Sequence, residues 1–324
     1  MSQPPNADGP PPIEVRGLVK RYGELTAVAG VDLTVNPGDV YGYLGPNGAG
    51  KTTSLRMMLG LISPTEGTVR LFGRDPLASI DALDGVAGFV EAPAFYPYLS
   101  GQRNLELLAA FDGGEAKKRI PEALEAVDLT DRARDRVGGY SHGMRQRLGI
   151  AAALLRDPKL LLLDEPATGL DPAGMRDMRL LIRRLADQGM TVLLSSHLLT
   201  EVEEVCNRVA IVRSGRIVYE GAIAELKRGA GATYKLSTTD DQRALAVCRA
   251  QPGILDVRYE NERIGFTADE SAVAELSQAL IEAGALIRAM APETVTLEDL
   301  FFSLTEGDGA SSSPADREAV QAAP

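Results

Sequence analysis

Residues 45–53 read Gly45-Pro46-Asn47-Gly48-Ala49-Gly50-Lys51-Thr52-Thr53 and match the pattern G-x-x-x-x-G-K-[ST] at every fixed position. The glycines let the backbone curl so that successive N–H groups point at phosphate oxygens. The apolar stretch 39–44 predicts a buried strand before the motif, and the spacing in 53–59 predicts a helix after it. This context predicts a nucleotide site in which Lys51 bridges the β- and γ-phosphates and Thr52 offers its hydroxyl to Mg²⁺. The plain alternative is a turn before a helix with a solvated lysine, and the remaining motifs count against it.

Composition excludes several classes of protein. The chain has 324 residues, 44% of them hydrophobic, which suits about two domains with a sizeable core. Its net charge of −11 opposes broad contact with nucleic acid, so we expect no nucleic-acid partner. No apolar run reaches the roughly 18 residues of a membrane span, so we expect no transmembrane segment of its own. Cys206 and Cys248 lack the spacing of zinc or disulfide cysteines and are expected in the core of a cytoplasmic protein.

Four segments are expected along the chain. The polar, proline-rich residues 1–12 predict a disordered leader without the features of a signal peptide. A nucleotide-binding domain is expected over 13–228, and a Gly- and Ala-rich joint at 229–232 leads into a small α+β domain over 229–305. The low composition complexity of 306–324 predicts a disordered tail.

Alternating strands and helices predict an α/β fold for the first domain. Helical spacing from 101 to 139 predicts an inserted helical subdomain over about 95–145, followed by a helix over 145–156 with Ser141 as its N-cap. Another helix is expected over 175–186. The expected strands are 13–22, 33–35, 39–44, 67–73, 86–90, 160–164 and 191–195, with a hairpin of 209–212 and 216–219.

The order strand, helix, strand, strand, helix, strand is expected in the second domain. This is the split βαβ, or ferredoxin-like, arrangement. The expected elements are strands 234–237, 255–259, 263–267 and 286–290 and helices 242–250 and 272–283, with a final helix over 296–304.

Polar side chains follow the ends of the expected strands. Asp164 and Glu165 end an apolar strand, where ligands of parallel sheets collect, and His197 lies just past the next strand. Hydrolysis of a phosphoanhydride mainly needs positioning and charge neutralisation at the γ-phosphate. We therefore expect Asp164 to hold Mg²⁺, Glu165 to orient and polarise the attacking water, and His197 to donate a hydrogen bond to the γ-phosphate.

Tyr22 ends the first expected strand as an exposed aromatic residue. Its ring could stack on an adenine base beside the phosphate site. The alternative is that it caps a sheet edge.

These motifs together resemble the nucleotide-binding subunit of ABC transporters over about residues 13–225. Tyr22 matches the adenine-stacking aromatic residue, 45–52 the phosphate loop, Ser141-His142-Gly143-Met144 the signature, 160–165 the Walker B strand and His197 the switch histidine. The resemblance implies a P-loop NTPase with a RecA-like core. It also implies a homodimer or paired cassette in which each ATP is clamped between the phosphate loop of one copy and the signature loop of the other.

The resemblance implies a set of contacts to ATP and its Mg²⁺. The residues expected to bind ATP are Tyr22, Gly45, Pro46, Asn47, Gly48, Ala49, Gly50, Lys51, Thr52, Thr53, Glu91, Ser141, Gly143, Asp164 and Asp171. Of these, Thr52, Glu91 and Asp164 are expected at the metal. The expected catalytic residues are Glu165 and His197.

Two positions depart from the family pattern. His142 replaces a glycine of the signature, while Ser141 and Gly143, which would meet the partner's γ-phosphate, are retained. Glu91 stands where most of the family carries a glutamine that links Mg²⁺ and water to the membrane partner. A carboxylate adds negative charge beside ATP and cannot donate a hydrogen bond, so we expect altered coupling rather than loss of binding.

Two stretches indicate a branch of the family. Residues 91–97, Glu-Ala-Pro-Ala-Phe-Tyr-Pro, resemble the bacitracin-resistance and lantibiotic-immunity branch, and 296–304 resemble the ending of drug-exporting subunits. The resemblance implies an ATP-hydrolysing subunit at the inner face of the cell membrane that energises export of a drug, antibiotic or peptide-like compound. A separate permease would dock near 91–100, which carries Phe95, Tyr96 and Tyr98.

Two other functions are open to this sequence. One is a soluble ABC ATPase acting on ribosomes or DNA, which a single cassette without a long coiled coil and with an acidic composition argues against. The other is a regulatory subunit that binds ATP but turns over poorly, which Glu91 and His142 make conceivable.

Overall fold

The computed structural model describes residues 9–91, 93–112, 114–229, 232–260, 263–293 and 296–306. Most of the expected leader, the centre of the joint at Ala230 and Gly231, and all but the first residue of the expected tail lie outside the described residues. The chain divides into two units, Met1–Gly221 and Ala222–Pro324, and each is described by itself.

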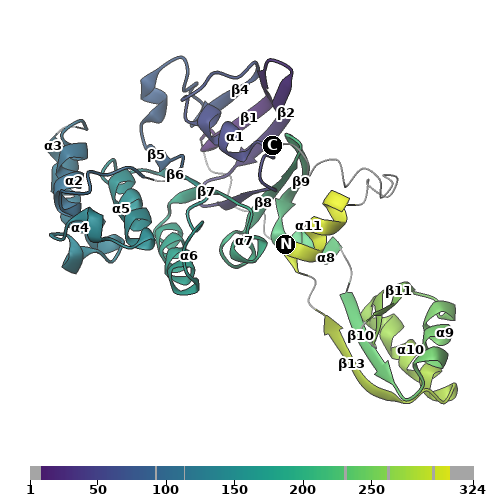
Figure 1. Cartoon of the computed structure of the whole chain (residues 1–324). Coiled ribbons are helices and arrows are strands. Elements are labelled where there is room, and N and C mark those ends of the chain that lie inside the picture. Colours follow the sequence, from purple (N-terminus) through teal and green to yellow (C-terminus); the bar gives the residue numbers. More distant parts are fainter. Residues whose placement is uncertain are drawn as a thin grey trace, which may run out of the picture. The chain divides into compact units, whose positions relative to one another are not determined.

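A six-stranded sheet forms the centre of the first unit (Figure 1). Its order is β5-β6-β7-β3-β8-β9, and the pairs from β5 through β8 are parallel. Every residue of β3, β6 and β7 is buried, as expected for parallel strands covered on both faces. The strands are β3 (Val40–Leu44), β5 (Val86–Phe89), β6 (Leu160–Asp164), β7 (Thr191–Ser196), β8 (Arg208–Arg213) and β9 (Arg216–Ala222).

A second, antiparallel sheet has the order β2-β1-β4. It consists of β1 (Ile13–Tyr22), β2 (Leu25–Val35) and β4 (Glu66–Leu71). The prediction of a strand only at 33–35 was too short. Leu18 pairs with Val31 and Val19 with Ala29, so Gly30, at φ 92°, is an extra residue in β2. This bulge breaks the alternation of apolar residues that would have marked the earlier part of the strand.

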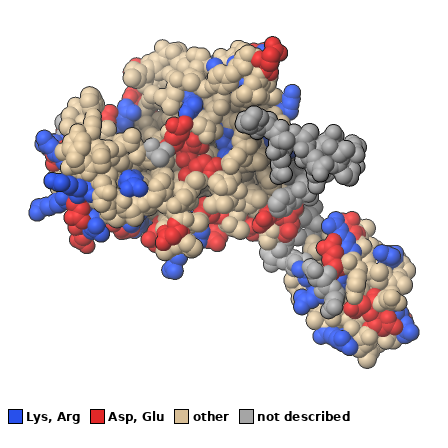
Figure 2. All heavy atoms as spheres, viewed as in Figure 1, with Lys and Arg blue, Asp and Glu red and all other residues tan. Residues whose placement is uncertain are grey.

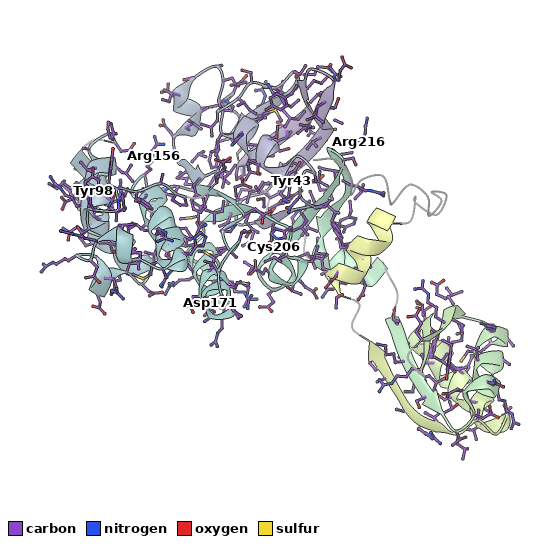
Figure 3. The ribbon with its side chains drawn as sticks, viewed as in Figure 1. Tyr43, Tyr98, Arg156, Asp171, Cys206 and Arg216 are labelled. Carbon is purple, nitrogen blue, oxygen red and sulfur yellow. The ribbon has the colours of Figure 1, made fainter. Side chains whose placement is uncertain are left out.

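Helix α1 (Lys51–Met58) packs in the hydrophobic core that both sheets share. Its Leu55, Met57 and Met58 are fully buried. Figure 3 draws the side chains of this unit and labels Tyr43 of β3 in its interior. The Tyr43 hydroxyl is hydrogen-bonded to Ser54 Oγ of α1 at 3.1 Å, and burial raises the pKa of Tyr43 to about 12. The helix that carries the phosphate-loop lysine is thereby tied to the strand before the loop.

The predicted helical subdomain is present between β5 and β6. Ser141 caps α5 as predicted, because its Oγ accepts a hydrogen bond from the Met144 N–H at 3.2 Å. The helix begins at His142, earlier than the expected 145. The elements are α2 (Gly101–Ala109), α3 (Gly114–Lys118), α4 (Ile120–Ala126), two short 3-10 turns (Thr130–Arg132 and Val137–Gly139) and α5 (His142–Leu154).

Helices α6 (Pro172–Asp187) and α7 (Leu199–Val205) follow β6 and β7. Asp171 caps α6 by accepting from the Gly174 N–H at 3.0 Å. The sequence prediction included α6 but not α7, which is short and begins two residues after His197. A 3-10 turn (Ile80–Leu83) precedes β5.

The second unit contains a four-stranded antiparallel sheet in the order β11-β12-β10-β13. With α9 and α10, the chain order is consistent with the expected split βαβ arrangement. Phe266 and Leu276 lie in its own hydrophobic core. The elements are α8 (Ile223–Gly229), β10 (Ala232–Thr238), α9 (Asp241–Ala250), β11 (Ile254–Glu260), β12 (Arg263–Ala268), α10 (Glu270–Glu282), β13 (Ile287–Glu293) and α11 (Leu297–Glu306).

The described surface shows no broad basic area on the face drawn in Figure 2, where acidic and basic side chains are interspersed. None of the helices in the described part of the chain has the length and apolar character needed to cross a bilayer.

Replacing Tyr43 by Phe is expected to destabilise the first unit by about 1 to 3 kcal/mol, because it leaves the buried Ser54 hydroxyl without its partner. Urea denaturation of the full chain measures this. The double variant Tyr43→Phe/Ser54→Ala is the control, since it removes both partners and should lose less than the sum of the two single changes. Additive losses would show that the hydrogen bond contributes nothing.

Candidate nucleotide site

The phosphate loop lies between β3 and α1 with its backbone packed closely against neighbouring strands. A Cβ atom at Gly45 would lie 2.5 Å from the Val212 carbonyl oxygen, and one at Gly50 would lie 2.3 Å from that of Ala27. Gly50 also has φ 96°, a backbone angle that residues with a side chain rarely adopt. Only glycine fits at these two positions, so the loop presents bare backbone at the start of α1.

Lys51 is held at the base of this loop. Its Nζ donates to the carbonyl oxygens of Gly45 at 2.8 Å and Pro46 at 3.3 Å, and it lies 3.1 Å from Glu165 Oε1. Its side chain is only 5% exposed. The positive charge of Lys51 is therefore held inside the loop, where phosphate oxygens would bind.

Asp164 ends β6 as a buried carboxylate with two hydroxyl partners. Thr52 Oγ1 donates to its Oδ2 at 2.9 Å, and Ser195 Oγ of β7 donates to its Oδ1 at 2.5 Å. Ser195 Oγ also accepts from the Glu165 N–H at 2.9 Å. The parallel register places Ser195 directly opposite Asp164, so β7 orients both acidic residues.

Three side chains contact the Glu165 carboxylate. Thr168 Oγ1 donates to its Oε2 at 2.8 Å, His197 Nδ1 donates to the same oxygen at 2.6 Å, and Lys51 lies against Oε1. Burial by itself raises the pKa of Glu165, but the Thr168 hydrogen bond and the charge of Lys51 outweigh it and hold that pKa below its ordinary value. Glu165 is therefore ionised at neutral pH. Its backbone, at φ 49°, lies in the left-handed region that non-glycine residues adopt only uncommonly.

The tautomer of His197 follows from its contact. A carboxylate can only accept, so Nδ1 carries the proton that is donated to Glu165. Donation from Nε2 to a phosphate at the same time requires the imidazolium form.

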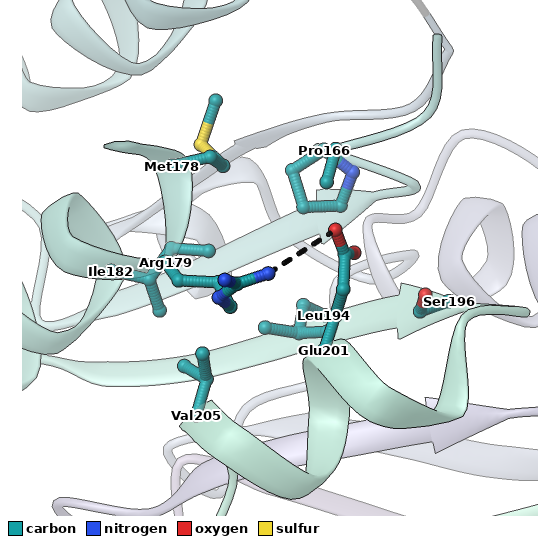
Figure 4. Close-up of a pocket in the computed structure, with 9 residues that line it drawn as sticks. Pro166, Met178, Arg179, Ile182, Leu194, Ser196, Glu201 and Val205 are labelled. Atoms are coloured by element: carbon teal, nitrogen blue, oxygen red, sulfur yellow. Dashed lines mark ion pairs between the residues drawn. The ribbon is translucent and has the colours of Figure 1, made fainter. Parts of the chain in front are cut away.

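A cavity of about 20 Å³ lies behind this pair, lined by the neighbours of both residues (Figure 4). Pro166 follows Glu165, and Ser196 precedes His197. Glu201 of α7 also lines the cavity, and it lies 4.0 Å from Arg179 of α6. Its Oε1 has no hydrogen-bond partner among the described residues, and burial raises the pKa of Glu201. The ion pair between Glu201 and Arg179 thus joins α7 to α6.

Tyr22 lies at the end of β1 with about half of its side chain exposed. The Lys20 ammonium sits 5.0 Å from the centroid of its ring and also donates to the Ser63 carbonyl oxygen at 2.7 Å. Lys20 therefore fixes the ring by a cation–π contact on one face. Stacking of an adenine base on the Tyr22 ring stays a prediction.

Glu91 forms an ion pair with Arg56 of α1. Its side chain is 66% exposed, and its backbone has φ 71°. The structure thus places Glu91 against the helix of the phosphate loop and not in hydrogen-bonding contact with Asp164. Ala92, the next residue of the expected docking segment, lies outside the described residues.

The signature residues lie at the start of α5. Ser141, which is predicted to meet the nucleotide of a partner cassette, is exposed. His142 Nε2 donates to the Thr168 carbonyl oxygen at 3.2 Å. Gly143 lies beside the loop that leads to Asp171. A Cβ atom added at Gly143 would lie 3.6 Å from Leu170, the residue before Asp171.

The structure brings the side chains of five sequence-predicted residues into one connected group, which also includes the backbone carbonyls of Gly45 and Pro46. Hydrogen bonds and ion pairs join them in one cluster: Lys51, Thr52, Asp164, Glu165 and His197. The described contacts of Tyr22, Glu91 and Ser141 lie outside that cluster.

Four residues of the site were missed by the sequence analysis. They are Lys20, Arg56, Thr168 and Ser195. Thr168 could have been found from its position three residues after Glu165, where a turn brings a side chain back. Lys20, Arg56 and Ser195 act through pairing between distant segments, for which a single sequence carries no signal.

The residues present fit ATP and Mg²⁺. The bare loop backbone and the buried Lys51 suit phosphate oxygens, and the adjacent Asp164 carboxylate and Thr52 hydroxyl suit a hard cation. The described residues hold no group of three or more His, Cys, Asp or Glu that could bind a metal by themselves. A metal held by one carboxylate, one hydroxyl and substrate phosphates matches the usual chemistry of Mg²⁺.

Comparisons with known proteins agree with this geometry. The family model described as ABC transporter matches residues 28–168. Bacitracin transport ATP-binding protein BcrA of Enterococcus faecalis is 38% identical over 299 residues, covering 92% of this chain and 97% of that protein. Daunorubicin/doxorubicin resistance ATP-binding protein DrrA of Streptomyces peucetius is 36% identical over 314 residues, covering 90% of this chain and 92% of that protein.

Solved structures extend the match to the fold. The structure of an ATP binding subunit of an ABC transporter superposes with a TM-score of 0.60 at 28% identity, covering 67% of this chain and 92% of that one. A dimeric ATP-binding cassette in a post-hydrolysis state, bound to ADP and Pi, matches with a TM-score of 0.58 at 25% identity, covering 65% of this chain and 98% of that one. This confirms the prediction of an α/β P-loop NTPase. The chain belongs to the ABC transporter family, and it is an ATP-binding subunit with ATPase activity.

Proposed function

We propose that this subunit energises export of a drug, antibiotic or peptide-like compound through a separate membrane permease at the inner face of the cell membrane. Two cassettes would close on MgATP, and hydrolysis would separate them. The observation that carries the proposal is the connected group of Lys51, Glu165 and His197 at the phosphate loop. The names of BcrA and DrrA concern bacitracin transport and daunorubicin resistance, which favours export over a ribosomal or DNA-directed role.

The residues of the group divide the work of hydrolysis. The loop backbone and Lys51 hold the phosphates, while Asp164 and Thr52 would hold Mg²⁺. When bound, Mg²⁺ neutralises charge on the phosphate oxygens and orients them. Glu165, ionised and fixed by Thr168, orients and polarises the attacking water. The Nδ1 proton of His197 is engaged by Glu165, and its Nε2 would face the γ-phosphate.

The permease would dock on the segment from Glu91 to Ser100. Asn104 of α2 ties this segment to the helical subdomain, because its side-chain amide bonds both the N–H of Tyr96, at 2.8 Å, and its carbonyl oxygen, at 3.1 Å. Tyr96 and Tyr98 remain 54% and 64% exposed, with ring centroids 5.8 Å apart. Exposed aromatic side chains on a fixed backbone are typical of protein interaction sites. The Glu91–Arg56 pair would link this surface to α1.

Lys51→Ala is expected to weaken MgATP binding by at least about tenfold, because it removes the buried positive charge of the phosphate loop. Isothermal titration calorimetry measures the affinity, and circular dichroism verifies the fold. Lys118→Ala, which changes a 73% exposed lysine, is the matched control. Equal affinities for the Lys51 variant and the native chain would refute the assignment.

Glu165→Gln is expected to retain MgATP binding, to slow hydrolysis by about 10² or more, and to accumulate an ATP-bound dimer, since the amide cannot take a proton from water. Light scattering after size-exclusion chromatography with ATP measures the dimer. Glu204→Gln, on a 55% exposed side chain, is the control. A Glu165 variant that stays monomeric with ATP bound would contradict the proposed closure.

Tyr96→Ala and Tyr98→Ala are expected to reduce recovery of the subunit with permease-containing membranes while leaving the ATPase rate of the isolated subunit within about twofold. Ile80→Ala, which truncates a 78% exposed residue outside the segment, is the control. If all three variants sediment with membranes equally well, docking does not use this surface.

A further inference from the structure

His142 connects the signature loop to the loop that follows Walker B within one chain. Its Nε2–H donates to the Thr168 carbonyl oxygen at 3.2 Å. Its ring also covers Gly169, where an added Cβ would lie 3.5 Å from Nε2. Gly169 has φ 77°, so the loop reaches the imidazole through a conformation that glycine adopts readily.

The same loop holds the residue proposed to activate water. Thr168 Oγ1 donates to Glu165 Oε2 at 2.8 Å, and the Thr168 N–H donates to the Glu165 carbonyl oxygen at 3.1 Å. The hydroxyl and the N–H of Thr168 therefore both donate to Glu165, while the carbonyl oxygen of Thr168 accepts from His142. A continuous path of hydrogen bonds runs from the first residue of α5 to the Glu165 carboxylate.

We propose that His142 is a positioning residue that makes hydrolysis at one ATP of the dimer depend on the occupancy of the other. This inference rests on the proposed dimer, in which Ser141 meets the ATP that the partner holds, whereas Glu165 acts on the ATP of its own chain. His142, next to Ser141, thus joins a loop that contacts one nucleotide to a loop that serves the second.

The coupling is mechanical. Ser141 caps α5, so a nucleotide that engages Ser141 moves the first turn of the helix as a unit. Because His142 bonds the Thr168 carbonyl, that movement is carried to the turn between Glu165 and Leu170. Thr168 Oγ1 bonds the same Glu165 oxygen that accepts from His197, so displacement of Thr168 changes how Glu165 is aimed.

A merely structural role for His142 gives a different result. If the imidazole only stabilises the loop, its loss lowers thermal stability and leaves the two ATP sites as strongly coupled as before. If it transmits occupancy, its loss separates the sites even where the fold is intact. Cooperativity is therefore the property that distinguishes the two roles.

The test compares His142→Ala and Thr168→Val with the double variant. Two controls keep the hydrogen-bonding groups: His142→Gln retains an N–H donor, and Thr168→Ser retains the hydroxyl. Hydrolysis is measured against MgATP concentration, and binding of a non-hydrolysable ATP analogue is followed by calorimetry. Thr168 is exposed, so its substitution leaves the fold testable if the His142 variant does not fold.

The native chain and both controls should show a Hill coefficient of about 2, the number of sites in the dimer, in hydrolysis and in analogue binding. His142→Ala, Thr168→Val and the double variant should each show about 1, with the same fall in kcat of about three- to tenfold. Unchanged Hill coefficients in the single variants, or a loss in the double variant equal to the product of the two single losses, would overturn the relay. A native chain that neither dimerises with ATP nor shows cooperativity would instead refute the proposed dimer.

Discussion

A buried ammonium group at the base of the phosphate loop constrains the structure around it. Lys51 is 6% exposed, and a buried charge is stable only when it is paired and hydrogen-bonded. The carbonyls of Gly45 and Pro46 and the carboxylate of Glu165 meet this requirement. The loop must therefore curl back over its own helix, and β6 must end beside it. The parallel sheet and its packing on α1 satisfy both conditions.

Two successive carboxylates serve different partners at that strand end. Asp164 is the last residue of β6, and its side chain is fixed by Thr52 and Ser195. Glu165, at φ 49°, turns out of the strand direction toward Lys51, Thr168 and His197. The left-handed backbone at this residue is what separates the two carboxylates. The residue proposed to hold Mg²⁺ and the residue proposed to orient water can therefore stand next to each other in the sequence.

The connections around this group differ in how readily they break. The cluster at Glu165 is partly buried and joined by several hydrogen bonds, whereas the Glu91–Arg56 pair is largely exposed. An exposed ion pair contributes only about 0 to 1 kcal/mol to stability. Glu91 can therefore exchange Arg56 for another partner at little cost, while Glu165 holds its position. This contrast suits a surface that receives a second protein beside a site that must stay ordered.

The sequence by itself determined the phosphate loop with its flanking strand and helix, the strand ending in Asp164 and Glu165, the Ser141 cap and the order of elements in the second unit. These features depend on local periodicity and on residues with special backbone or capping chemistry, which act within a few positions along the chain. Only the tertiary structure decided that Ser195 orients Asp164, that Arg56 pairs with Glu91, and that His142 reaches Thr168. Each of these contacts joins segments that strand register or helix packing brings together, and no local pattern records which distant residue will stand opposite.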